Sequence, residues 1–119
     1  MSDILYAEEL RVRDKGRLLA VTFHGGDAYD IPAELLRVES PSAEVQGHGP
    51  GDEVLVAGKR NVTIVGVEAV GTYAVKLIFS DGHDTGLYTW PYLAHLGRNR
   101  ASMMTDYEKR LAKAGKTRG

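Results

Sequence analysis

The pattern of hydrophobic and polar positions from Glu9 to Tyr88 is typical of short β-strands separated by glycine-containing turns. In the first predicted hairpin, Leu19, Val21 and Phe23 occur at every second position and therefore share one face. The expected strands are 10–13, 18–24, 28–31, 61–70, 73–79 and 85–88. The turns between them include 14–16, 25–27, 71–72 and 80–82.

Two short helices are predicted, each after a pair of strands. Pro32 suits the first turn of a helix that continues to Leu36, because its fixed φ matches the helical value. Trp90 and the proline after it begin a second helix, which is expected to end at Gly97.

The stretches 23–27 and 79–83 are similar and lie 56 positions apart. Each is followed by a strand and a helix that begins with proline. Because the spacing to the two prolines differs, we interpret the similarity as common turn chemistry and not as a duplication.

An apolar stripe at helical spacing predicts a longer helix near the C-terminus. The stripe consists of Met104, Tyr107, Leu111 and Ala114. Thr105 and Glu108 have the spacing of a capping box, while Asn99 and Ser102 are alternative starts. Gly115 can end the helix, and the residues after it are expected to be frayed.

The segment 39–60 is rich in serine, proline, glycine and charge, which predicts a long loop with a short strand at 53–56. A loop longer than about 15 residues in a small domain usually has a functional role or is mobile. The predicted fold class is α+β, mainly antiparallel β-sheet of five or six strands with two short helices and a C-terminal helix. We expect one domain at 1–97, followed by a basic helix and tail at 98–119.

The amino-acid composition excludes several kinds of functional site. The chain has 119 residues and no cysteine, which excludes disulfides, thiolate metal centres and a cysteine nucleophile. With 15 basic and 16 acidic side chains, it lacks the net positive charge that nucleic-acid binding usually requires. The basic residues are concentrated at 98–119, where a solvated helix face is the preferred interpretation over a site for RNA or an acidic partner.

The N-terminal residues carry acidic side chains and lack the apolar run of a signal peptide. No segment approaches the roughly 18 apolar residues that span a bilayer. We therefore expect a cytoplasmic protein with no membrane partner.

Four histidines, His24, His48, His83 and His95, are candidate metal ligands or bases, and none has a second ligand at a recognised metal spacing. His83 is the best placed, because Asp81 and Asp84 flank it and could raise the pKa of its imidazole or share a cation with it. The alternative is a polar hairpin turn in which these residues only satisfy backbone geometry. His48 lies among glycines in the long loop, where a solvated side chain is the simpler interpretation.

Other catalytic patterns are missing from the sequence. The glycines at 47–51 lack the lysine and the following helix of a phosphate-binding loop. Ser40 and Ser42 lie close to Glu44 and His48, but no nucleophile elbow surrounds them. We assign no catalytic residue and expect a protein that is not an enzyme.

Three stretches together resemble a known family: Leu35–Val38 before the serine- and proline-rich loop, Gly66–Val75, and Asp81–Leu93. They are similar to the N-terminal domain of gamma-butyrobetaine hydroxylase, and more closely to small bacterial stand-alone proteins of that domain family, a domain of unknown function. The resemblance covers about Glu9 to Gly97.

In the hydroxylase, the resemblance implies a zinc-binding accessory module that precedes a separate iron- and 2-oxoglutarate-dependent oxygenase barrel. Its zinc motif, Cys-x-Cys-x-x-Cys with a histidine in a later Asp-Gly-His turn, falls here on Ser40, Ser42, Val45 and His83. Three of the four ligands are missing, so the resemblance implies the fold without the metal. Some relatives resemble domains fused to ATPases of iron–sulfur cluster assembly, which suggests an accessory role in metallocofactor assembly.

Two functional hypotheses follow. The preferred one is a non-catalytic binding domain without a cofactor, whose sheet face, or the surface near the His83 turn, contacts an unidentified protein. Tyr88, Trp90 and Tyr92 would be its anchors, with burial in the core as the alternative. The second is a metal-binding protein or metal-dependent enzyme with a site at His83, with Asp81 and Asp84 and with His48 from the loop. The oligomeric state stays open.

Overall fold

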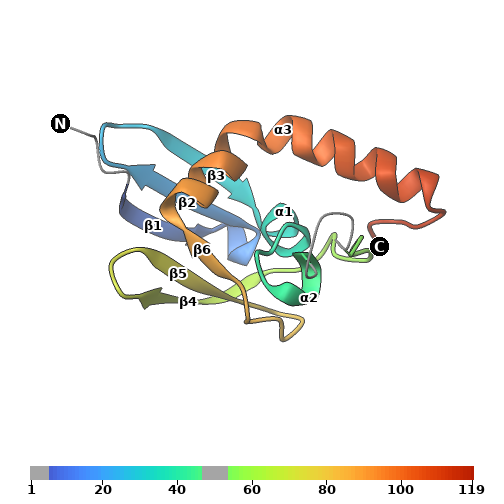
Figure 1. Ribbon diagram of the computed structural model, residues 1–119, viewed down its shortest axis with the longest axis horizontal. Helices are drawn as coiled ribbons and strands as arrows, with labels where there is room; N and C mark the ends of the chain where they lie inside the picture. The colour runs from blue at the N-terminus through green and yellow to red at the C-terminus, as the bar shows by residue number, and fades with distance from the viewer. Residues whose placement is uncertain (1–5, 47–53) are drawn as a thin grey trace.

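The computed structural model describes residues 6–46 and 54–119, which form two three-stranded antiparallel sheets, each followed by a helix (Figure 1). The first sheet contains β1 (Ala7–Arg13), β2 (Leu18–Phe23) and β3 (Ala28–Pro32), and α1 (Ala33–Val38) follows it. The second contains β4 (Ile64–Val70), β5 (Ala74–Phe79) and β6 (Leu87–Thr89), and α3 (Trp90–Lys113) follows it. Along the chain, a short helix, α2 (Ala43–Gln46), follows α1 and precedes the second sheet. The α+β class is confirmed, with six strands divided between two sheets.

The first hairpin turns where the sequence predicts it. Asp14, Lys15 and Gly16 form a single 3-10 turn (η1, Asp14–Gly16) and all have positive φ. At Gly16 the backbone passes so close to the start of β4 that a Cβ would lie 2.8 Å from the carbonyl oxygen of Ile64. Glycine is required here both by its φ of 90° and by this contact, which brings the two sheets together.

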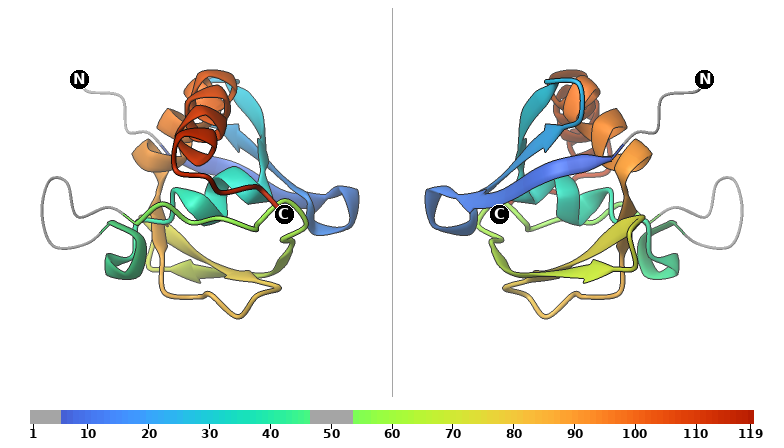
Figure 2. Two further views of the ribbon diagram at one scale, coloured as in Figure 1. Left: turned by 90° about the vertical axis from the view of Figure 1, so that its right-hand side faces the viewer. Right: turned by 90° about the vertical axis from the view of Figure 1, so that its left-hand side faces the viewer.

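The core lies between the two sheets and the helices α1 and α3. Leu19, Val21 and Phe23 point into it as predicted, and Leu77 and Phe79 of β5 meet them from the second sheet. Figure 2 shows the two sheets as separate layers with α1 between them at one end. The central strand of each sheet supplies most of the buried side chains, and Ile31, Ile64 and Tyr88 add to them from the outer strands.

The predicted helix end at Gly97 is wrong, because α3 runs without a break for 24 residues from Trp90. Gly97 is buried against the ring of Tyr29 on β3, and a Cβ there would lie 2.6 Å from that ring. The glycine therefore permits close packing and does not end the helix. Thr89 is the N-cap, and Thr105 lies in the helix interior, where its hydroxyl donates to the carbonyl of Ala101.

The apolar stripe predicted for the C-terminal helix is confirmed in part. Tyr107 and Leu111 are buried and Met104 is half-buried, whereas Ala114 is exposed. Gly115 follows the helix end with φ of 70°, as predicted. The expected division at residue 97 falls inside α3.

The C-terminal tail is ordered against the body, contrary to the frayed end that the sequence predicts. The amide of Gly58 donates to Thr117 O, and the amide of Arg60 donates to Arg118 O. The guanidinium of Arg118 forms an ion pair with the buried carboxylate of Glu34 on α1, with Nη2 2.7 Å from Oε1. An ion pair at a buried carboxylate explains why the tail folds back.

The segment 39–60 contains more structure than a loop. It includes α2, and residues 54–56 form no strand, although the amide of Val54 donates to Val45 O. Residues 47–53, which include His48 and the start of the predicted strand at 53–56, lie outside the described part of the chain. Among the described residues, no helix is long and apolar enough to cross a membrane.

Candidate functional site around His83

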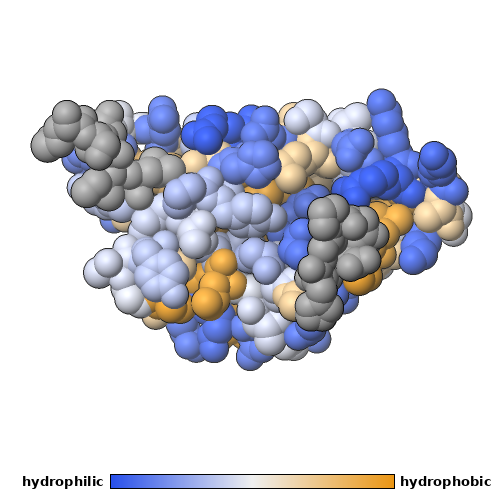
Figure 3. Space-filling view, viewed as in Figure 1, coloured by the Kyte–Doolittle hydropathy of each residue, from blue (hydrophilic) through white to orange (hydrophobic). Residues whose placement is uncertain are grey.

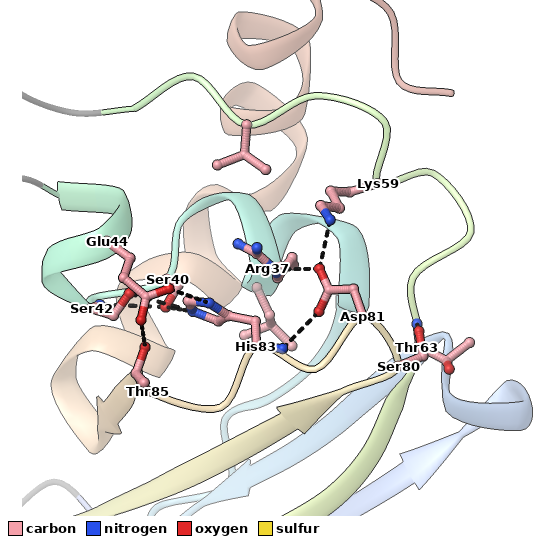
Figure 4. A network of polar contacts seen from close by, with 12 residues as sticks. Arg37, Ser40, Ser42, Glu44, Lys59, Thr63, Ser80, Asp81, His83 and Thr85 are labelled. Atoms are coloured by element: carbon pink, nitrogen blue, oxygen red, sulfur yellow. Dashed lines mark hydrogen bonds and ion pairs between the residues drawn. The ribbon is translucent and has the colours of Figure 1, made fainter.

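The imidazole of His83 lies at the junction between the β5–β6 turn and the segment that connects α1 to α2 (Figure 4). Its Nε2 is 2.9 Å from Ser40 Oγ and 3.4 Å from Ser42 Oγ. The side chain is only 4% exposed. The structure therefore brings together three of the positions that the family resemblance singles out.

Local structure places the two serines. Helix α1 ends before Ser40, and the Ser42 carbonyl accepts from the amides of Val45 and Gln46 at the start of α2. The side-chain amide of Gln46 donates to Ser40 O at 2.9 Å, which fixes the connecting segment. Gly86 faces this segment so closely that a Cβ would overlap Ser40 Oγ.

The turn that carries His83 is closed by backbone hydrogen bonds. The amide of Phe79 donates to His83 O at 3.0 Å, and that of Gly82 donates to Phe79 O at 2.9 Å. Asp81 Oδ1 accepts from the His83 amide at 3.0 Å, as aspartate does in an Asx-turn. This geometry directs the imidazole toward the serines and the Asp81 carboxylate toward the opposite side.

At the opposite edge of the imidazole, Nδ1 lies 3.6 Å from Oε2 of Glu44. The other carboxylate oxygen of Glu44, Oε1, accepts a hydrogen bond from Thr85 Oγ1 at 3.0 Å. Burial lowers the pKa of His83, and the charge of Arg37 lowers it further; Glu44 and the two nearby aspartates act in the opposite direction without reversing the shift. The imidazole is therefore neutral at pH 7. When the ring carries its proton on Nδ1, facing the carboxylate, Nε2 is free to accept a hydrogen bond from the Ser40 hydroxyl.

Asp81 does not flank the imidazole as predicted. Its Oδ2 is 2.7 Å from Arg37 Nε and 2.7 Å from Lys59 Nζ. Burial opposes ionisation of Asp81, but hydrogen bonds from Lys59, the His83 amide and Arg37 outweigh it and hold the pKa of the carboxyl well below its ordinary value. Asp84 is exposed on the turn.

The contacts from Ser40 to His83 and from His83 to Glu44 resemble the catalytic triad of a serine hydrolase, but the serine is not accessible as a nucleophile. Ser40 is completely buried, and Gly86 packs against it. A hollow of about 790 Å³ lies elsewhere, over the first sheet beside Arg11 and Arg100. A substrate carbonyl has no route to Ser40 in this arrangement.

The donor set also does not fit the zinc ion of the hydroxylase domain that this chain resembles. Structural zinc is bound by four thiolate or imidazole ligands, and hydroxyl oxygens are poor substitutes. Val45, at the fourth implied position, is a buried hydrocarbon side chain. No group of three or more His, Asp or Glu side chains within 6–46 and 54–119 is arranged to hold a metal ion.

The three aromatic residues proposed as anchors are used in the fold. Tyr88 is fully buried and its hydroxyl donates to Leu36 O. Tyr92 is half-buried and donates to Glu39 O, and burial raises its pKa to about 12. Trp90 is half-buried, and its Nε1 donates to Thr72 O at 2.9 Å. A binding role for these side chains stays a prediction.

Three further residues of this network are not identified by the sequence reasoning: Arg37, Lys59 and Thr85. Arg37 and Lys59 come from other segments than the Asp-Gly-His turn, so spacing could not indicate them, and the sequence indicates Glu44 only as a neighbour of the two serines. A charged residue between apolar neighbours on a short helix, as at Arg37, is the one signal that could point to a buried ion pair.

Comparison with known proteins agrees with the fold. A solution structure determined by NMR shares 48% identity and a TM-score of 0.84, covering 98% of this chain and 91% of that one. A second NMR structure shares 46% identity, also with a TM-score of 0.84, over 98% of this chain and 87% of that one. The crystal structure of a protein of unknown function, of the DUF971 family from Acidithiobacillus ferrooxidans, shares 40% identity and a TM-score of 0.63 over 76% of this chain and 91% of that one.

A search of curated proteins found no match. The family model described as "Gamma-butyrobetaine hydroxylase-like, N-terminal" matches residues 10–94, the part of the chain that contains both sheets, both serines and His83. The chain therefore belongs to the gamma-butyrobetaine hydroxylase-like N-terminal domain family.

Proposed function

We propose that this chain is a non-catalytic domain that binds a protein partner through the outer face of its second sheet. The observation that carries the proposal is a set of exposed hydrophobic side chains on and beside this sheet, here called the β4 face: Val65 on β4, Leu87 on β6 and Tyr73 in the turn between β4 and β5. They are 64%, 55% and 41% exposed and make up half of the six large hydrophobic side chains exposed in the described residues. An exposed apolar patch is a common mark of an interaction site.

The surroundings of the β4 face suit a protein contact. Apolar surface is visible over the second sheet at the lower left of Figure 3. Lys76 Nζ and Glu68 Oε1 form an ion pair at 3.4 Å directly across the β4–β5 ladder, on the same side of the sheet as Leu87, which pairs with Lys76. An apolar area with a polar pair resembles the anatomy of a transient interface.

The β4 strand also offers backbone groups. It is the edge of the second sheet, and the described residues give it no backbone partner other than β5 over residues 65–70. An edge strand can accept an extended segment of another protein by adding its main-chain hydrogen bonds. The register shift between Ile64 and Gly66 confines regular pairing to the later part of the strand.

The site around His83 supports the non-catalytic part of the proposal. Its nucleophile candidate is closed from solvent and its donors do not fit a metal centre, so no chemistry of an enzyme follows from it. A role in metallocofactor or iron–sulfur assembly rests on the family resemblance alone, and the identity of the captured partner would support it or count against it.

A capture experiment tests the proposal. The wild-type chain should retain a specific partner from the native cytoplasm, and Val65→Lys with Leu87→Lys should lose it at least about tenfold, because charges are placed in an apolar contact. Val12→Lys is the matched control, since Val12 is 42% exposed on the first sheet. Circular dichroism should show all three proteins folded.

Two results would contradict the proposal. One is a wild-type chain that captures no specific partner. The other is a partner retained equally by the β4-face variant, or lost equally with Val12→Lys.

A further inference from the structure

The junction between the α1–α2 segment and the β5–β6 turn corresponds to the zinc position of the hydroxylase domain that this chain resembles. We infer that in this chain the junction is closed by hydrogen bonds alone, through a cluster of Ser40, Ser42 and His83 that we call the Ser–His clasp. This inference does not depend on the proposed partner.

Burial shows that the clasp is a structural centre. Four polar or charged residues are buried in the described part of the chain, and three of them form the clasp. The fourth, Glu34, is ion-paired with Arg118. Buried polar groups destabilise a fold unless they have hydrogen-bond partners. Three such residues in mutual contact therefore indicate a specific structural contact.

Hydrogen bonding occupies Nε2, the ring nitrogen of His83 that faces the two serines. Nε2 of His83 accepts from Ser40, whose oxygen in turn lies 3.4 Å from the Ser42 amide. Among buried side-chain atoms of the described residues, only Nη1 of Arg37 lacks a partner, and a guanidinium is not a metal ligand. A metal ion at Nε2 would have to break the hydrogen bond between Nε2 and the Ser40 hydroxyl. The serine oxygens beside it would then be poor ligands for the ion.

Neighbouring contacts close the junction from both sides. Thr85 donates to Glu44, and Tyr88 donates to Leu36 O, so the β5–β6 region is attached to α1 and α2 at points beside the clasp. The clasp therefore takes the position of a metal centre within a wider set of contacts that need no ion.

Thermal unfolding of the full untagged chain tests the inference. The wild-type midpoint should change by less than about 1 °C with EDTA or with added Zn²⁺, because no ion binds the folded state selectively. Ser40→Ala should lower the midpoint by about 5 °C or more, since it leaves the buried Nε2 without its donor.

Ser102→Ala is the matched control, because Ser102 is an exposed serine on α3 whose hydroxyl donates to Asn99 O, and its midpoint should stay within about 2 °C of wild type. Equal midpoints for Ser40→Ala and Ser102→Ala would overturn the inference.

Metal analysis gives an independent outcome. One equivalent of metal retained after dialysis would overturn the inference, as would a zinc-induced rise of the midpoint that His83→Gln abolishes and His24→Gln, a variant of an exposed histidine, does not. If Ser40→Ala does not fold, these measurements on the wild-type chain still decide between the clasp and a metal centre.

Discussion

At the scale of single residues, His83 experiences opposing effects of burial and charge. Its imidazole is removed from water and faces two hydroxyls, which favours the neutral ring, while Glu44 favours the charged ring. Burial prevails, so the pKa of His83 in the folded chain lies below its ordinary value of 6.5.

Stability should therefore fall as the solution becomes acidic. The unfolded chain binds a proton at His83 near pH 6.5, before the folded chain does, so the contribution of the neutral ring is complete above that pH and is lost as the pH falls below it. Urea midpoints of the wild type should decrease between about pH 7.5 and 5.5, and those of His83→Gln should decrease less.

Other titrating groups do not obscure this comparison. The lowered pKa of Asp81 changes the stability of the chain only at pH values below about 3.8, the ordinary pKa of this group. Burial raises the pKa of Glu39, which acts in the opposite direction, but Glu39 is present in both proteins. A pH dependence that is identical in the wild type and His83→Gln would contradict a buried neutral imidazole.

Gly97 shows how packing can overrule a local preference. Alanine is a better helix former than glycine by about 1 kcal/mol, but a Cβ here would meet the Tyr29 ring at 2.6 Å. We expect Gly97→Ala to destabilise the fold by about 1–3 kcal/mol in chemical denaturation, the range for an overpacked core. A variant as stable as the wild type would show that Tyr29 moves without cost. Gly115→Ala is no substitute control, because Gly115 has positive φ.

At the scale of elements, the tail and α1 are coupled through one ion pair. Arg118 contacts Glu34, which is buried on α1, and Glu108 on α3. Because Arg118 Nε and Nη2 both bond to Glu34, removing the guanidinium leaves a buried carboxylate unpaired.

Arg118→Ala should destabilise the chain by about 2 kcal/mol, less than a fully buried pair because the guanidinium is partly exposed. In a Glu34→Gln background the same change should cost clearly less, and a double-mutant cycle on the free energies of unfolding measures the difference. Additive effects of the two changes would show that the tail is held by its backbone contacts alone.

Elements that depend on local pattern could be predicted from the sequence. Alternation located the strands, the Asp-Lys-Gly turn located the first hairpin, and Gly115 located the end of α3. Features that depend on distant contacts could not: Gly97 is explained only by Tyr29, and the ordered tail only by Glu34.

The candidate site divides in the same way. His83 and Asp81 could be placed on one turn because the Asp-Gly motif favours that turn, and the family resemblance placed Ser40 and Ser42 with His83. The direction of the Asp81 carboxylate could not be predicted, because it depends on Arg37 and Lys59 from other segments.

At the scale of the whole molecule, the two sheets are built alike. Each is an antiparallel meander followed by a helix, and the turn after each central strand has the same hydrogen bonds. Phe23 donates to Asp27 O and accepts from Gly26, as Phe79 donates to His83 O and accepts from Gly82. The similarity of the stretches 23–27 and 79–83 therefore corresponds to one turn geometry used twice.

Every strand pair within residues 6–46 and 54–119 joins neighbours along the chain, and this has a consequence for how the chain folds. Closing a short loop costs little conformational entropy, so each meander can form before the other is in place. The long-range cost is concentrated in the association of the two meanders and in the docking of α3, whose Tyr107 reaches Val56 and whose following tail reaches α1. Assembly of this domain is thus a problem of joining two locally formed halves and not of threading distant strands.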